Sequence, residues 1–194
     1  MYREREERIV RKRTTLAAAV LAAATVPVAA GISTAADGPA GPAAASAQES
    51  AKEVLADGGT TLLDSHVSGN EDPGSTAKQN VLDTSRGEGA RTSPWSDVGV
   101  TRVGLSAKMM AGLVSIGKDH PIRVTTIAGG DHSSNSYHYA GTAVDIDRID
   151  GSAVDANHPK VGAVKAACER LGAVEILGPG DPAHDGHVHC AWSS

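Results

Sequence analysis

The sequence predicts an α+β fold, in which helices pack on a small, mainly antiparallel β-sheet. Two observations support this prediction: helical and strand-like apolar patterns both occur, and they follow one another without the strict strand–helix–strand rhythm of a parallel sheet. The chain has 194 residues, enough for one domain of ordinary size. Because aromatic residues make up only 3% of the chain and Phe is absent, we expect a core of Ala, Val, Leu and Ile.

Residues 1–47 have the pattern of an export signal. A basic segment ends at Arg13, a short apolar run covers Leu16–Val26, and a small-residue cleavage site lies directly before Gln48. The apolar run is too short for a comfortable membrane span, so we expect no stable membrane insertion after processing. An uncleaved N-terminal anchor is the alternative. With cleavage, the exported chain begins at Gln48.

The chain beyond this signal is acidic. Residues 48–194 carry 12 Lys and Arg against 19 Asp and Glu. A surface of this negative charge argues against non-specific binding to nucleic acid phosphates or to anionic lipid. We therefore expect no nucleic-acid partner. We further expect a monomer.

Residues 48–101 carry the weakest signals. Short helices are predicted over 51–55 and 75–83, and Ser75 is a suitable N-cap for the second. Turn-forming residues separate the two helices, and residues 86–94 are predicted to be loop. We interpret this segment as an N-terminal extension that packs on the domain formed by the rest of the chain.

Residues 102–194 carry clearer signals. Apolar residues recur at helical spacing over about 104–117, and this helix is expected to end before Pro121, because proline disfavours helical geometry at the residue before it. Residues 122–127 contain alternating β-branched residues and predict a strand. A second strand is predicted over 142–147.

The last part of the chain adds one helix and two strands. Pro159 is expected to open the helix, and Gly172 follows its end. Residues 173–177 and 187–192 predict the two strands, with a turn rich in Gly and Pro between them.

The chain contains two cysteines. Cys168 lies in the last predicted helix and Cys190 in the last predicted strand, both on faces that we expect to be buried. In an exported protein this pair favours a disulfide, and the alternative is two small buried hydrophobic residues. A metal cluster built on several thiolates is excluded by the count alone.

Histidines and aspartates gather on the polar faces of two predicted strands. Alternate side chains of an extended strand share a face, so His187 and His189 point to the same side. Asp145 lies on the polar face of the earlier strand. His138 precedes Asp145 by seven residues, and a chain reversal at Gly141 can bring its ring beside that carboxylate. If the two strands are neighbours, these groups form one surface.

Two neutral imidazoles and one carboxylate, with water in the fourth position, form a usual ligand set of a catalytic zinc ion. Zinc in such a site lowers the pKa of water to about 7 and can polarise a carbonyl oxygen. A second histidine about 7 Å along the same strand face is near enough to move a proton. The sequence therefore predicts one Zn²⁺ ion and a hydrolytic enzyme.

The spacing His138-x6-Asp145, followed by His187-x-His189, resembles the paired signature of the zinc peptidases of the D-alanyl-D-alanine carboxypeptidase group (peptidase family M15 and its LAS-type relatives). The resemblance covers residues 102–194. It implies the fold that these peptidases share with the amino-terminal signalling domain of hedgehog. It also implies a zinc metallopeptidase whose partner is a cell-wall peptide substrate.

Two longer patterns make this resemblance more specific. Residues Ser136–Ile146 match the pattern Ser-x-His-x-x-Gly-x-Ala-x-Asp-Ile, and the addition of His184 gives a spacing similar to that of a peptidoglycan endopeptidase branch. The resemblance thus implies hydrolysis of stem peptides or cross-links in peptidoglycan, by carboxypeptidase or endopeptidase action. A protein with this substrate would be secreted or associated with the cell wall.

The family pattern also implies a role for each matching residue. It makes His138, Asp145 and His189 the ligands of one Zn²⁺ ion. It makes His187 the general base or the transition-state partner, and it places His184 in the lining of the site.

One feature of the family pattern is missing. Many members have an Arg shortly before the first motif to hold the scissile carbonyl, whereas the nearest upstream Arg here is Arg123, within a predicted strand. Without this Arg, the scissile carbonyl would be stabilised by His132, by His184 or by the metal alone. The missing Arg also supports an alternative from another class: a catalytically inactive, zinc-containing module that binds a cell-wall peptide.

Overall fold

The computed structural model describes residues 45–194, and it confirms the α+β class. Residues 1–44, and with them nearly all of the predicted export signal, lie outside the described part of the chain. Within the described part, no helix has both the length and the apolar character needed to cross a membrane.

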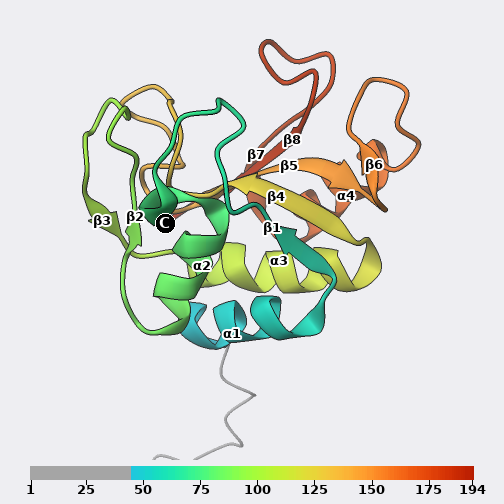
Figure 1. The fold of residues 1–194 in the computed structure, drawn as a ribbon. Helices are drawn as coiled ribbons and strands as arrows, with labels where there is room; N and C mark the ends of the chain where they lie inside the picture. Colours follow the sequence, from blue (N-terminus) through green and yellow to red (C-terminus); the bar gives the residue numbers. More distant parts are fainter. Residues whose placement is uncertain (1–44) are drawn as a thin grey trace, which may run out of the picture. The chain divides into compact units, whose positions relative to one another are not determined.

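A six-stranded mixed sheet forms the centre of the fold (Figure 1). Its strands follow the order β1-β4-β5-β8-β7, with β6 paired to β5. Only β1 and β4 run parallel, and the other pairs are antiparallel, as the sequence predicts. The six strands are β1 (Thr60–Leu62), β4 (Ile122–Thr126), β5 (Ala143–Ile149), β6 (Ser152–Ala153), β7 (Ala173–Leu177) and β8 (Val188–Trp192).

Four α-helices accompany this sheet in the described chain. Figure 1 shows α1 and α3 side by side beneath the sheet, where they contact each other. A 3₁₀ turn and a separate two-stranded ribbon complete the fold. These elements are α1 (Ala47–Asp57), η1 (Pro73–Ser75), α2 (Ala77–Ser85), β2 (Ala90–Arg91), β3 (Arg102–Val103), α3 (Ala107–Asp119) and α4 (Val161–Arg170).

The segment 48–101 contributes directly to the sheet and the core. Strand β1 adds to the sheet beside β4, and helix α1 packs against α3. Val54 and Val81 are buried in the same hydrophobic cluster as the apolar residues of the later helices and strands. The segment is therefore continuous with the core of residues 102–194.

Helix α1 begins earlier and ends later than the predicted helix over 51–55. Ser46 caps it: the Ser46 hydroxyl accepts the backbone N–H of Glu49, and the Glu49 carboxylate accepts the backbone N–H of Ser46. This reciprocal capping box satisfies two N–H groups that the first turn leaves free. The predicted cleavage position before Gln48 therefore lies inside the first turn of a folded helix.

The prediction of Ser75 as the N-cap of α2 is wrong. The N-cap is Thr76, whose hydroxyl accepts the backbone N–H of Gln79. Ser75 instead ends the 3₁₀ turn, and its hydroxyl bonds to Asp72 and Ser93. Two adjacent hydroxyl residues both suit a cap, and the tertiary partners of Ser75 decide which one serves.

The other predicted elements all form, most with shifted ends. Helix α4 begins at Val161, after Lys160 as N-cap, rather than at Pro159, and β8 begins at Val188, so His187 precedes the strand. Helix α3 starts at Ala107, because Ser106 caps it, and ends at Asp119, before Pro121 as predicted. The predicted loop over 86–94 contains the short strand β2. Strand β7 has the predicted bounds, and β5 extends two residues beyond the predicted end at 147.

The predicted disulfide is confirmed. Cys168 of α4 and Cys190 of β8 are joined, with their Cα atoms 6.2 Å apart. Both cysteines are fully buried, as is Trp192 two residues further along β8. The Trp192 indole N–H donates to the Leu171 carbonyl at 2.9 Å, which ties the same face of β8 to the end of α4.

Candidate metal centre

Neighbouring strands bring two of the predicted ligands together. Asp145 of β5 and His189 of β8 are directly paired in the antiparallel ladder. Directly opposite residues in such a ladder point to the same face of the sheet. The His189 Nδ1 atom consequently lies 2.9 Å from the Asp145 Oδ1 atom, and both side chains are buried.

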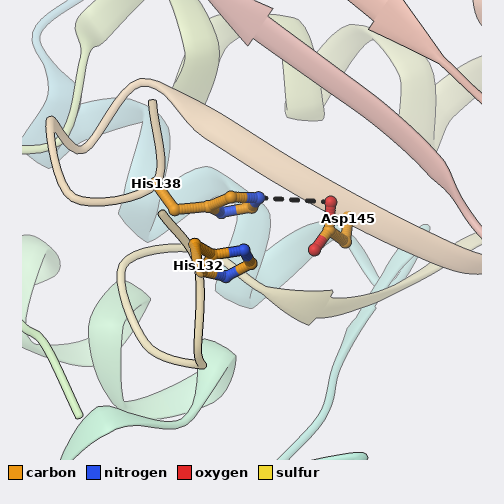
Figure 2. Close-up of side chains that lie close together, drawn as sticks. All are labelled: His132, His138 and Asp145. Carbon is orange, nitrogen blue, oxygen red and sulfur yellow. Dashed lines mark ion pairs between the residues drawn. The ribbon is translucent and has the colours of Figure 1, made fainter. Parts of the chain in front are cut away.

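A tight turn adds the third predicted ligand. The Gly141 backbone N–H donates to the His138 carbonyl at 2.9 Å, which closes the turn before β5. Gly141 has φ of 71°, and a Cβ atom there would lie 2.5 Å from the Gly104 carbonyl oxygen, so only glycine fits. His138 is placed with its Nε2 atom 3.3 Å from Asp145 Oδ1 (Figure 2).

The three candidate ligand atoms form a nearly regular triangle. His138 Nε2 lies 3.2 Å from His189 Nδ1, and the two nitrogens lie 3.3 and 2.9 Å from Asp145 Oδ1. Ligand atoms arranged tetrahedrally about zinc at about 2 Å lie about 3.3 Å from one another. The structure therefore brings these atoms around one shared point, at a spacing suited to a metal ion.

A backbone contact fixes which nitrogen of His138 faces this point. Its Nδ1 atom lies 2.6 Å from the Ile127 carbonyl oxygen, which is an acceptor only. Nδ1 therefore donates to this carbonyl, and Nε2 is the ring atom that faces Asp145 and His189. In the neutral ring, Nε2 carries the lone pair that a metal would bind. His138 is almost completely buried, so this orientation is strongly constrained.

His132 is a second neighbour of the same pair. His132, His138 and Asp145 offer ligand atoms that all lie within 4.8 Å of one another, a group that can hold a metal ion. Figure 2 shows the His132 and His138 rings in parallel, with ring centroids 4.0 Å apart and planes at 13°. His132 lies outside both motifs, so their spacing did not mark it as a metal ligand; the sequence analysis considered it only for carbonyl stabilisation.

The two possible sets share His138 and Asp145 and differ in the second imidazole. The set with His189 is the tighter, because its three atoms lie within 3.3 Å of one another. His132 Nε2 instead lies 3.2 Å from the Gly129 carbonyl oxygen. The short distances favour His189 over His132 as the third group beside His138 and Asp145, and the His132 ring stacks on that of His138.

Burial and neighbouring charges set the protonation of the cluster. Burial, followed by the neighbouring His138 ring, lowers the pKa of His132 from 6.5 to about 4. Burial favours neutral Asp145, but His138 and His189 outweigh it and hold the pKa of Asp145 well below its usual range. The cluster therefore contains a carboxylate and a neutral His132 ring near pH 7.

His187 and His184 lie beside this cluster, as the spacing of the second motif predicts. His187 Nε2 is 3.7 Å from Asp145 Oδ1, and its side chain is 27% exposed. Burial chiefly lowers the pKa of His187. The His184 ring is centred 4.8 Å from the His187 ring, and its Nδ1 atom lies 2.6 Å from the Pro182 carbonyl oxygen.

All five predicted site residues line one cleft of about 740 Å³. The N-terminal segment forms part of its wall through His66, Val67 and Ser68, so residues 48–101 help to shape it. Exposed apolar side chains of Val67 and Tyr137 lie among the lining residues. The cleft is lined by six of the eight histidines: His66, His132, His138, His184, His187 and His189.

The cleft-lining residues in the described chain include no Lys or Arg. Arg123, the nearest Arg before the first motif, instead pairs with Asp147 through both carboxylate oxygens. The polar position of Asp147 on β5 is thus used for an ion pair between strands β4 and β5.

A scan against protein-family models found no match to this chain, and a search of curated proteins found none either. The resemblance to zinc peptidases therefore depends on the residues of the two motifs. The geometry of the cluster is the independent observation on which a functional proposal can be built.

Proposed function

We propose that this protein is an exported, zinc-dependent peptidase that hydrolyses peptide bonds in the stem peptides or cross-links of peptidoglycan. The observation that supports this proposal best is the convergence of His138 Nε2, Asp145 Oδ1 and His189 Nδ1. The α+β architecture is compatible with the hedgehog-type peptidase fold that we propose for it. The open cleft around these atoms gives a peptide room to reach them.

The chemistry of the donor set fits zinc. Two imidazole nitrogens and one carboxylate oxygen suit Zn²⁺ near neutral pH, whereas Ca²⁺ and Mg²⁺ favour six or more oxygen ligands. His138 presents a lone pair toward the shared point, and Asp145 is held as a carboxylate. We infer that these two residues and His189 hold one zinc ion.

Bound zinc would supply Lewis acidity, which makes water acidic near pH 7 and polarises a carbonyl oxygen. His187 would provide the proton transfer. Its Nε2 atom faces the same oxygen of Asp145 as the two ligand imidazoles, which places it beside the reacting groups. We propose that it accepts the proton of the attacking water and returns it to the departing amine.

We assign carbonyl stabilisation to His184 and the metal, rather than to His132. Burial keeps His132 uncharged near pH 7, and its Nε2 atom faces the Gly129 carbonyl. A neutral ring whose N–H is already donated cannot also donate to a developing oxyanion. His184 lines the cleft, and its ring is centred 4.8 Å from that of His187, which places it close to the proposed proton-transfer group.

The direct test is mass spectrometry of muropeptides incubated with the zinc-loaded protein. We expect new products that disappear when a chelator is added. We expect His187→Ala to retain zinc and to lose roughly 10²–10⁴-fold of the turnover. His120→Ala is the matched control, because His120 lies at the end of α3 and is not among the cleft-lining residues. Full activity of His187→Ala would show that this role is wrongly assigned.

The charge of the cleft favours one second candidate, an inactive module that binds a cell-wall peptide. Arg123 is paired with Asp147 and does not line the cleft, and the described lining residues include no guanidinium to hold a scissile carbonyl. Such a module would still bind zinc, so metal content does not separate the two proposals. Muropeptides that are retained by the protein but stay intact would favour the binding module.

A further inference from the structure

The outer nitrogen of the His189 ring is an unusual feature of the cluster. Among the described residues, His189 Nε2 is one of two buried polar side-chain atoms that have no hydrogen-bond partner. Buried polar groups are nearly always paired, so such an atom calls for an explanation. The Glu175 Oε1 atom lies 3.4 Å from this nitrogen.

Glu175 reaches this ring from the edge of the sheet. It lies on β7, the last strand in the sheet order, directly opposite Ala191 of β8. His189 is two residues from Ala191 on β8, so Glu175 and His189 are diagonal neighbours across the two strands. The Glu175 side chain is 44% exposed, which leaves it free to rotate and shorten the 3.4 Å separation.

His138, on the other side of the cluster, already has a hydrogen-bond acceptor at its outer ring nitrogen. There the outer nitrogen of His138 faces the Ile127 carbonyl, and this contact leaves the inner nitrogen with its lone pair. A histidine that binds a metal usually donates its other ring N–H to a carboxylate or carbonyl, which fixes both its tautomer and its orientation. His189 has the inner contacts of such a ligand, and the Glu175 carboxylate lies at its outer nitrogen.

We propose that Glu175 is a positioning residue, whose carboxylate accepts the Nε2–H of His189 and thereby directs the Nδ1 lone pair toward the shared point, where it would bind the metal. This inference rests on the proposed zinc site, because it explains how one of its ligands is oriented. Glu175 touches neither the shared point nor the scissile bond. It acts through His189.

The test compares three variants of the full chain with the wild type. Glu175→Ala removes the acceptor, and Glu175→Gln keeps an acceptor oxygen at the same length. Glu169→Ala removes an exposed glutamate from α4 and is the control. Zinc affinity is measured by competition with a chromogenic chelator, and the protonation of the His189 ring is measured by ¹H–¹⁵N NMR.

We expect Glu175→Ala to weaken zinc binding by roughly 10–100-fold, the usual effect of losing such a partner. In the zinc-loaded wild type, the Nε2–H of His189 should give a slowly exchanging resonance. That resonance should persist in Glu175→Gln and in Glu169→Ala and should vanish in Glu175→Ala. A merely structural role of Glu175 on the edge strand would not separate the Gln variant from the Ala variant in this way.

Two results would overturn the proposal: unchanged zinc affinity in Glu175→Ala, or a His189 Nε2–H that exchanges equally fast in the wild type and in that variant. Spectra of the metal-free chain distinguish this failure from failure of the proposed function. If the wild type binds no zinc, the peptidase proposal fails, and the spectra then show only whether the Glu175 carboxylate accepts the Nε2–H of His189.

Discussion

The Cys168–Cys190 disulfide offers a prediction whose size follows from the structure. The bridge spans a sequence separation of 22 residues, and closing a loop of this length lowers the entropy of the unfolded chain enough to contribute about 3.4 kcal/mol to stability. For a domain of this size, that free energy corresponds to a decrease of about 7–14 °C in Tm on reduction. With a typical urea m-value of about 2 kcal/mol/M, the unfolding midpoint falls by about 1.7 M.

The assay is urea unfolding of the oxidised and the reduced wild type, followed by circular dichroism. Free thiols are titrated in the denatured state to verify each redox form. The double variant Cys168→Ala/Cys190→Ala is the control, and it should unfold at the same urea concentration with and without reductant. Equal midpoints for the oxidised and the reduced wild type would refute the reasoning, because the cross-link would then place no constraint on the unfolded chain.

Three further predictions concern the ends and turns of the fold. Ser46→Ala removes half of the capping box and should lower the free energy of unfolding by about 1 kcal/mol. Urea unfolding measures this in a chain that has not been cleaved before Gln48. Burial alone would raise the pKa of Asp72, but its hydrogen bonds to Arg91 and Ser75 outweigh burial and lower it. The ion pair with Arg91 therefore stabilises the fold above about pH 4 and loses its effect as the pH falls through the lowered pKa. Asp72→Asn should cost about 2 kcal/mol at pH 7, and this cost should shrink as the pH falls below about 4. Gly141→Ala should lower both Tm and zinc affinity, since its new Cβ atom collides with a backbone oxygen at 2.5 Å; unchanged values of both would contradict the turn geometry.

The alternation of the strands explains why much of the site could be predicted. An extended strand leaves no choice about which side chains share a face. His187 directly precedes β8, and it still faces Asp145 on the same side as His189. The core residues on the opposite side, such as Cys190, made that face identifiable. Only the pairing of β5 with β8, a tertiary feature, was needed to bring His189 to Asp145.

The contacts that the sequence did not reveal are tertiary ones. His132 lies in a loop, and its stacking on His138 follows from the path of that loop. Glu175 is an ordinary charged residue of an edge strand until β7 pairs with β8. The choice of Thr76 over Ser75 as a helix cap is of the same kind, because Ser93, 18 residues away, engages the Ser75 hydroxyl.

The core and the site are two consequences of the same strand register. A slip of β8 by one residue would move His189 to the buried apolar face and turn Cys190 toward the cleft. The disulfide from Cys190 to α4 and the hydrogen bond from Trp192 to the end of that helix both oppose such a slip. Because these contacts lie on the face opposite to the histidines, they fix the ligand geometry without occupying the cleft. The side chains that stabilise the fold therefore also determine where the proposed metal ligands meet.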